Sequence, residues 1–204
     1  MIRVGEAAWL LELAGRAQVL AAHRALLARD DAAVRELVPG ASSLLVVVQP
    51  DAPLDDGALL AIEEAARAVA EAPPPTDPAR VHQIPVRYDG EDLAELAQRA
   101  GMSAGDFAAR HAGTEYQVAF VGFQPGFAYL GGLPRELHAL RRASPRARVA
   151  PGSVAIGGEW TGVYPLASPG GWHLLGRTDV VLFDAAAESP ALLQPGDVVR
   201  FVPR

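Results

Sequence analysis

Apolar and polar residues alternate through residue 88 in two periods, one typical of strands and the other of helices. Six segments carry these patterns, four of them strand-like (8–13, 34–38, 43–49 and 81–88) and two helical (16–29 and 57–71). Their order, β-α-β-β-α-β, is that of a split βαβ or ferredoxin-like unit. Because Pro85 cannot donate a hydrogen bond to a neighbouring strand, segment 81–88 is expected at an edge. The PPPTDP stretch at 73–78 is expected to be a stiff connector.

After residue 88 the pattern changes to short segments separated by glycine and proline. Two helices (91–100 and 104–112) and five strands (117–123, 153–157, 173–176, 180–183 and 197–202) are expected. Ser103 and Asp106 resemble a capping box, and His111 is expected to stabilise the end of the second helix. Many short strands between turn signals are typical of a barrel or a sandwich. The sequence therefore predicts an α+β chain with an N-terminal α/β domain at 1–88 and a β domain at 89–204.

Composition narrows the class of protein. Apolar residues make up 50% of the 204 residues, enough for a packed core, but no apolar run approaches the roughly 18 residues of a membrane span. The N-terminus lacks the features of a signal peptide and the chain has no cysteine, so a cytoplasmic location without disulfides is expected. The net charge of −6 argues against nucleic-acid binding, and the five histidines show no metal-ligand spacing.

Three segments of the second half interleave glycine and proline with aromatic residues. They are GFQPGFAYLGGLP (122–134), GSVAIGGEWTGVYP (152–165) and SPGGWHLLGRT (168–178). Glycine allows a close approach of backbone, and aromatic rings in loops provide flat apolar walls, so these segments are candidates for a binding site. By composition alone, the better explanation is a set of tight turns whose aromatic rings plug the ends of a barrel.

The same segments resemble those of a known family. GF-x-PGFAYLGGLP, RR-x-x-PR, GSVAIGG, TGVYP and SPGGW-x-L-x-GRT occur in that order. Together they are similar to the family of the small, B-type 5-oxoprolinase subunit, allophanate hydrolase subunit 1 and the KipI sensor-kinase inhibitor, of the carboxyltransferase subdomain C/D type. The resemblance is strong from about Tyr116 to Phe183, and it implies a cyclophilin-like β-barrel for the second domain. Two positions depart from the family pattern. The family usually has proline where this chain has Leu140, and it often has glutamine where this chain has Trp160.

Positive charge gathers between the first two of these segments. Arg141, Arg142 and Arg146 form a cationic cluster, and guanidinium groups bind carboxylate and phosphate through paired hydrogen bonds. The substrates that the resemblance implies, and ATP, are anionic, so this cluster is a candidate binding site. A solvated basic loop or an ion pair with a partner subunit explains it equally well. His173 and Arg177 lie four residues apart and share one face of an extended segment.

The candidate substrate-binding residues are basic, hydroxyl-bearing or aromatic: Arg142, Arg146, Arg177, His173, Ser153, Tyr164, Phe127 and Trp172. We expect loops 123–129, 141–153 and 161–177 to converge on one face of the barrel around a small, flat, anionic substrate. No catalytic residue is assigned, because neither Ser153 nor Thr161 lies in a GxSxG motif with a base nearby in the sequence.

The resemblance implies one component of a larger enzyme. The family includes ATP-dependent complexes that hydrolyse an amide, opening 5-oxoproline to L-glutamate or cleaving allophanate, and the chain alone is expected to be inactive. The implied partners are a larger cyclophilin-like component, the C-type 5-oxoprolinase subunit (also called allophanate hydrolase subunit 2), and a lactam-binding component of the A type. The sequence has no GxxxxGK[ST] motif, so any ATP site is not a P-loop. The alternative is a KipI-like inhibitor of autophosphorylation that docks on a histidine kinase through the N-terminal domain.

Overall fold

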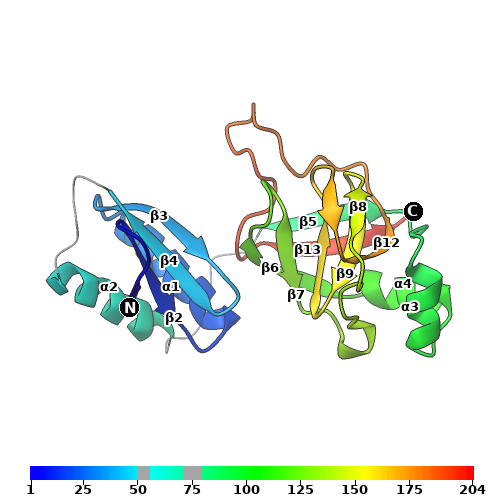
Figure 1. Cartoon of the computed structure of the whole chain (residues 1–204), viewed down its shortest axis with the longest axis horizontal. Helices are drawn as coiled ribbons and strands as arrows, with labels where there is room; N and C mark the ends of the chain where they lie inside the picture. Colours follow the sequence, from blue (N-terminus) through cyan, green and yellow to red (C-terminus); the bar gives the residue numbers. More distant parts are fainter. Residues whose placement is uncertain (50–55, 71–79) are drawn as a thin grey trace. The chain divides into compact units, whose positions relative to one another are not determined.

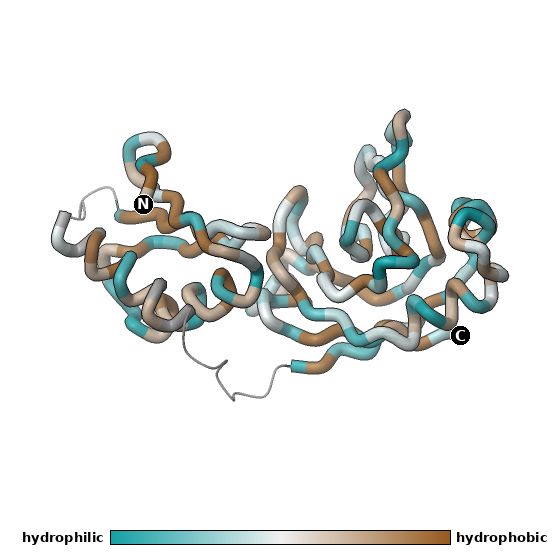
Figure 2. The backbone as a smooth tube through the Cα atoms, turned by 90° about the horizontal axis from the view of Figure 1, so that it is seen from below, coloured by the Kyte–Doolittle hydropathy of each residue, from teal (hydrophilic) through white to brown (hydrophobic). Residues whose placement is uncertain are grey.

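The computed structural model describes residues 1–49, 56–70 and 80–204, and it divides the chain into two compact units, Met1–Pro78 and Ala79–Arg204 (Figure 1). Hydrophobic and hydrophilic residues alternate along the backbone of both units (Figure 2). No helix of the described part is both long and apolar enough to cross a membrane.

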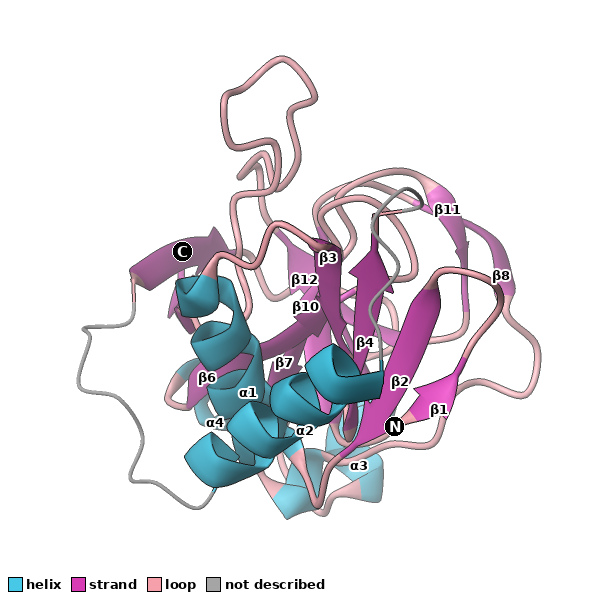
Figure 3. Cartoon of the chain, turned by 90° about the vertical axis from the view of Figure 1, so that its left-hand side faces the viewer, coloured by secondary structure: helices cyan, strands magenta, loops and turns pink. Residues whose placement is uncertain are grey.

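The first unit is a four-stranded antiparallel sheet with two helices on one face (Figure 3). Its elements are β1 (Ile2–Arg3), β2 (Ala8–Glu12), α1 (Arg16–Arg29), β3 (Val34–Pro39), β4 (Ser43–Val48) and α2 (Asp56–Ala70). The strands lie in the order β1-β2-β4-β3. Because side chains alternate between the two faces of a strand, Leu44, Val46 and Val48 of β4 share a face, and all three are buried. Leu26 of α1 and Ile62 of α2 pack in the same core.

The ferredoxin-like arrangement predicted for this unit is not confirmed. That arrangement needs the strand predicted at 81–88 to lie beside β2, but β1 lies there, with Ile2 opposite Leu10. The predicted strand is β5 (Val81–Val86), and it belongs to the sheet of the second unit. The division between the units therefore precedes β5 instead of following residue 88. The connector predicted at 73–78 lies outside the described residues.

The second unit is built around a seven-stranded sheet in the order β12-β9-β10-β7-β6-β13-β5 (Figure 1). Its further elements are α3 (Leu93–Arg99), α4 (Ala104–Ala112), β6 (Glu115–Val121), β7 (Ala128–Gly131), the 3-10 helix η1 (Arg135–Leu137), β8 (Arg146–Val149), β9 (Ser153–Gly157), β10 (Trp160–Val163), β11 (Ser168–Gly170), β12 (His173–Arg177) and β13 (Val198–Pro203). β5 runs parallel to β13, and its Ile84 and Val86 are buried in the core of this unit. Alternation in the sequence predicts such a strand but does not identify the sheet that it joins.

The sheet closes into a barrel through one bridge between its two outer strands. Arg87, directly after β5, exchanges two backbone hydrogen bonds of 2.9 Å with Arg177 of β12. The two backbones are so close that a Cβ on Gly176 would lie 2.2 Å from the carbonyl oxygen of Arg87. A Cβ on Gly90 would likewise lie 2.3 Å from the carbonyl oxygen of Leu174. Glycine at these two positions therefore permits the closure.

One predicted strand of this unit is wrong. Segment 180–183 forms no ladder, and Phe183 makes only an isolated bridge with Ala191 within a long loop that projects from the barrel (Figure 1). Leu182 is buried in the barrel core, so the apolar run in this segment reflects burial of a loop residue.

A buried histidine in the last turn of α4 joins that helix to the barrel. The hydroxyl of Tyr88 lies 2.8 Å from His111 Nδ1, and Thr161 Oγ1 lies 2.8 Å from Nε2. Because Thr161 donates its only proton to the carbonyl oxygen of Ala155, Nε2 of His111 must be the donor and Nδ1 the acceptor. Complete burial lowers the pKa of His111 to about 3, so the ring is neutral at pH 7. Both ring nitrogens of His111 therefore bind side chains outside α4, and neither binds the end of the helix that His111 was expected to stabilise.

The barrel closure predicts a steric effect at Gly176. We expect Gly176→Ala to lower the free energy of unfolding by about 3 kcal/mol, because the new methyl group forces the Arg87–Arg177 bridge apart. Gly105→Ala is the matched control, since Gly105 lies in α4 with no close backbone contact, and alanine there favours the helix by up to about 1 kcal/mol. Urea unfolding of both variants measures the difference. Equal stabilities would contradict the proposed closure.

Candidate functional site

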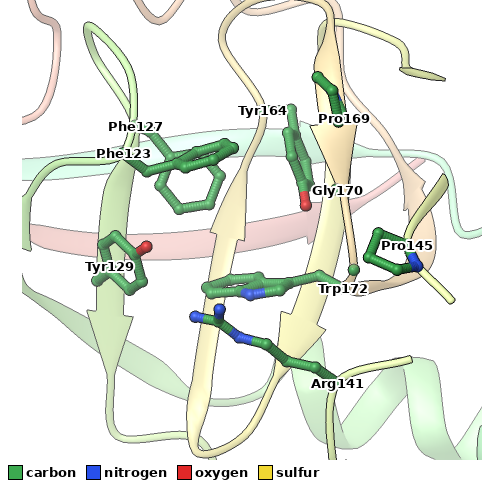
Figure 4. Close-up of a pocket in the computed structure, with 10 residues that line it drawn as sticks. Phe123, Phe127, Tyr129, Arg141, Pro145, Tyr164, Pro169, Gly170 and Trp172 are labelled. Carbon is green, nitrogen blue, oxygen red and sulfur yellow. The ribbon is translucent and has the colours of Figure 1, made fainter. Parts of the chain in front are cut away.

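A pocket of about 220 Å³ opens on the barrel unit where the three predicted loops meet (Figure 4). Its lining comes from all three loops: Phe123, Phe127 and Tyr129; Arg141 and Pro145; and Tyr164, Pro169, Gly170, Gly171 and Trp172. The predicted convergence of loops 123–129, 141–153 and 161–177 is therefore confirmed. Five of the ten residues are aromatic, so most of the wall is apolar and flat.

Trp172 forms a buried part of the wall, and two strand glycines make room for its ring. The side chain is only 4% exposed. A Cβ on Gly157 of β9 would lie 2.5 Å from the indole, and one on Gly162 of β10 would lie 3.3 Å from it. Phe127 and Tyr129 meet the same ring edge-to-face, with centroids 5.3 and 5.5 Å away. The glycines of GSVAIGG and TGVYP thus allow an aromatic wall to lie close against the strands.

Tyr164 adds a polar atom to this apolar wall. Its ring is 2% exposed, and a Cβ on Gly170 would lie 2.4 Å from the hydroxyl oxygen, so only glycine fits opposite it. Burial raises the pKa of Tyr164, although the Trp172 backbone N–H and the positive charge of Arg141 act in the opposite direction. The phenol is therefore neutral at pH 7 and can donate a hydrogen bond into the pocket.

Arg141 supplies the positive charge of the pocket. It is exposed, and Figure 4 shows its guanidinium group directed toward the Trp172 ring. Within the described residues it makes no ion pair with a carboxylate, so its hydrogen-bond donors remain available to a ligand. An unpaired guanidinium group beside aromatic rings suits a carboxylate on a small, flat molecule.

The neighbouring arginines are held elsewhere, by one buried carboxylate. Asp92 precedes α3 and is 4% exposed. Its Oδ1 accepts hydrogen bonds from Arg142 (3.1 Å) and Arg146 (2.9 Å), and its Oδ2 accepts the backbone N–H of Leu174 (2.7 Å). Arg146 also binds Glu91 at 2.9 Å. Arg142 and Arg146 therefore anchor their loop to the barrel, whereas the sequence placed them among the ligand-binding residues.

The pKa of Asp92 reflects the balance of these contacts. Burial would raise it, but the hydrogen bonds from Arg146 and the Leu174 N–H, with the charges of Arg146 and Arg142, bring it below its ordinary value. Asp92 is thus ionised at pH 7 and forms a compact, paired charge cluster with its two arginines. A buried carboxylate of this kind is stable only while its partners remain in place.

Three further residues in the predicted set do not line the pocket. Ser153 lies in β9 and is 7% exposed. His173 is buried, and its Nε2 donates to the carbonyl oxygen of Leu140 at 2.9 Å. The exposed Arg177 binds Asp89 at 2.8 Å. The aromatic members of the set, Phe127, Tyr164 and Trp172, do line the pocket.

The predicted set left out several lining residues, among them Phe123 and Arg141, although Arg141 belonged to the predicted cationic cluster. Arg142 and Arg146 are four apart and bind the same carboxylate, while Arg141 points into the pocket. The position of Phe123 depends on an unusual backbone angle, which apolar patterning does not reveal.

The pocket has the composition of a binding site. Its titratable lining residues are Arg141, Tyr129 and Tyr164, and it contains neither a carboxylate nor a histidine. No three His, Asp or Glu side chains in the described ranges are grouped so that they could hold a metal ion. The arrangement can bind and orient a small anion, but it offers no general base of its own.

Comparison with known proteins gives consistent matches along the chain. The family described as carboxyltransferase domain, subdomain C and D, matches residues 1–193. A protein of Escherichia coli O157:H7, named as the B-type 5-oxoprolinase subunit, is 48% identical over 174 residues, which are 84% of this chain and 78% of that protein.

Solved structures extend the similarity to the fold. The crystal structure of TTHA0988 superposes with a TM-score of 0.82 at 38% identity, over 97% of this chain but only 40% of the TTHA0988 chain. The present chain thus spans about two fifths of that protein. Urea carboxylase of Kluyveromyces lactis superposes with a TM-score of 0.72 at 18% identity, over 99% of this chain and 21% of that protein, which is a likeness of fold.

The Asp92 cluster predicts opposite outcomes for two arginines that the sequence grouped together. Arg146→Ala should lower the free energy of unfolding by about 2 kcal/mol at pH 7, because the arginine is 15% exposed and its loss leaves a buried carboxylate short of a partner. Arg177→Ala should cost less than about 1 kcal/mol, because that ion pair is 60% exposed on the arginine side.

Chemical denaturation at several pH values measures both variants. The pKa of Asp92 is lowered in the folded chain, so its contribution is complete above the unfolded value of about 3.9 and is lost as the pH falls through the folded pKa. The gap between wild type and Arg146→Ala should therefore narrow in acid. A loss for Arg177→Ala as large as that for Arg146→Ala would contradict the assignment.

Proposed function

The chain belongs to the carboxyltransferase-domain family, subdomain C and D, and we propose that it is one component of an ATP-dependent hydrolase complex that opens 5-oxoproline to L-glutamate. The relative named as the B-type 5-oxoprolinase subunit supports the reaction and the idea of a complex. The partner in this proposal is the larger, cyclophilin-like C-type component, with a lactam-binding component of the A type beside it. We also propose that the barrel of this chain is cyclophilin-like.

The observation that carries this proposal is an arginine, Arg141, that has no ion-pair partner in the described part of the chain and lies next to the aromatic walls of the pocket. 5-Oxoproline is a small ring with a flat lactam group and one carboxylate. Arg141 matches the carboxylate through charge-assisted hydrogen bonds, and the aromatic lining of the pocket matches the apolar part of the ring. The neutral hydroxyl of Tyr164 provides a donor for a lactam oxygen. Allophanate, a flat anionic amide, is the second substrate that such a pocket fits.

The pocket lining also supports a division of roles between this chain and its partner. ATP-dependent ring opening transfers the γ-phosphoryl group to the lactam oxygen and releases ADP. Water then adds to the activated carbon and the C–N bond breaks, which leaves an acyl phosphate. A second water hydrolyses this acyl phosphate to the carboxylate and inorganic phosphate. These steps need a base and a nucleotide site, and the pocket contains no carboxylate and no histidine. In this proposal the chain binds and orients the substrate, while the partner supplies those groups, so the isolated chain is inactive.

An assay of the assembled complex tests this proposal. The chain is co-purified with the larger component, and ATP-dependent release of glutamate from 5-oxoproline is compared with ammonia release from allophanate. Arg141→Ala should raise KM for the preferred substrate about 10- to 150-fold, the effect of losing one charge-assisted contact. Arg135→Ala, an exposed arginine in η1 outside the pocket, is the control and should leave KM unchanged.

Either of two results would overturn the proposal. A complex that hydrolyses neither substrate excludes the enzymatic role, and binding of the chain to a histidine kinase would then support the inhibitor alternative. Turnover by the isolated chain would contradict the division of labour with the partner.

A further inference from the structure

Phe123 combines two unfavourable features at the mouth of the pocket. Its φ is 72°, in the left-handed region where a bulky side chain is rare, and its side chain is 63% exposed. Asp30 is the other non-glycine residue with positive φ in the described ranges, and it ends α1, where a short polar side chain tolerates that angle. No comparable local reason accounts for a phenylalanine at position 123.

The turn around Phe123 is fixed by its neighbours. The Gly122 N–H donates to Phe127 O at 3.0 Å, and the Phe127 N–H donates to Gln124 O at 3.0 Å. Gly126 packs so tightly that a Cβ there would lie 2.7 Å from the Cβ of Phe183. These contacts hold the backbone in place, so the strained angle at Phe123 persists without any help from its exposed ring.

The strained angle places the ring at the outer edge of the pocket. Phe123 meets Phe127 edge-to-face, with centroids 5.5 Å apart and planes at 80°, and it lies 6.5 Å from Tyr164 at 90° (Figure 4). Phe127, Tyr164 and Trp172 are at most 4% exposed, so their inner faces are already covered. Phe123 is the aromatic lining residue that still has a large apolar surface to cover, and it faces the same cavity as Arg141.

We propose that Phe123 is a substrate-contact residue that packs against the bound lactam ring and holds its carboxylate at Arg141. This inference rests on the proposed function, because it takes 5-oxoproline as the ligand. Substrate binding covers the exposed ring of Phe123, which removes the cost of keeping that apolar surface in contact with water. The backbone strain is the consequence of directing an aromatic side chain over the opening from a tight turn.

Three substitutions in the assembled complex separate strain from contact. Phe123→Gly removes both the strain and the ring, so the melting temperature should rise by about 4 °C while KM for 5-oxoproline rises about 10-fold. Phe123→Ala removes the ring but keeps a side chain at positive φ, so KM should rise equally without the gain in melting temperature. Phe123→Tyr keeps the aromatic face and should retain the wild-type KM.

Affinity between the components of the complex is measured in parallel, because a partner protein is the other surface that could cover Phe123. Unchanged assembly with a raised KM supports contact with the substrate. Weakened assembly with an unchanged KM would assign the ring to the partner and overturn the inference. An active wild-type complex whose Phe123→Gly variant keeps both its KM and its assembly would refute this inference alone. A wild-type complex without 5-oxoproline turnover would remove the proposed function and this inference together.

Discussion

The carboxylate of Asp92 is the contact on which the shape of the pocket depends. It lies in the barrel unit before α3, and it binds two arginines of the loop that forms one pocket wall and the backbone of β12. Burying an unpaired carboxylate would cost several kcal/mol, so the loop and the strand are held wherever their donors can reach it. Since Arg142 and Arg146 are committed to Asp92, Arg141 is left as the cation of the pocket.

Close backbone approach is the second constraint, and it explains the glycines of the three segments. Gly176 lets the barrel close against Arg87, and Gly157 and Gly162 let the indole of Trp172 lie against the strands. Glycines that the sequence pattern explains as turn residues therefore also set the position of the aromatic wall. Both explanations considered for these segments, tight packing within the barrel and a binding surface, apply to different residues of the same loops.

Local pattern predicted most of the elements, and the errors lie where distant partners decide. The helix predicted at 16–29 has the bounds of α1, because the glycine before it, Gly15, marks its start within the local sequence. The strand at 81–86 was recognised but assigned to the wrong sheet, since its partner β13 lies more than a hundred residues later. In the site, the buried aromatic residues Phe127, Tyr164 and Trp172 were predictable from the glycine-rich loops. The roles of the arginines were not, because Asp92 lies about 50 residues before Arg142 and nothing local links them.

Amide hydrogen exchange in an Asp92→Ala variant tests the dependence on Asp92 most directly. In the wild type, the Leu174 N–H donates to Asp92 and the Arg142 N–H donates to Gly171 O, so both amides should be protected. Loss of the carboxylate should speed exchange at these two amides at least about 10-fold, while amides within α4 keep their wild-type rates. Unchanged protection at Arg142 and Leu174 in the variant would show that the pocket wall is held by other contacts, and it would contradict the central role of Asp92.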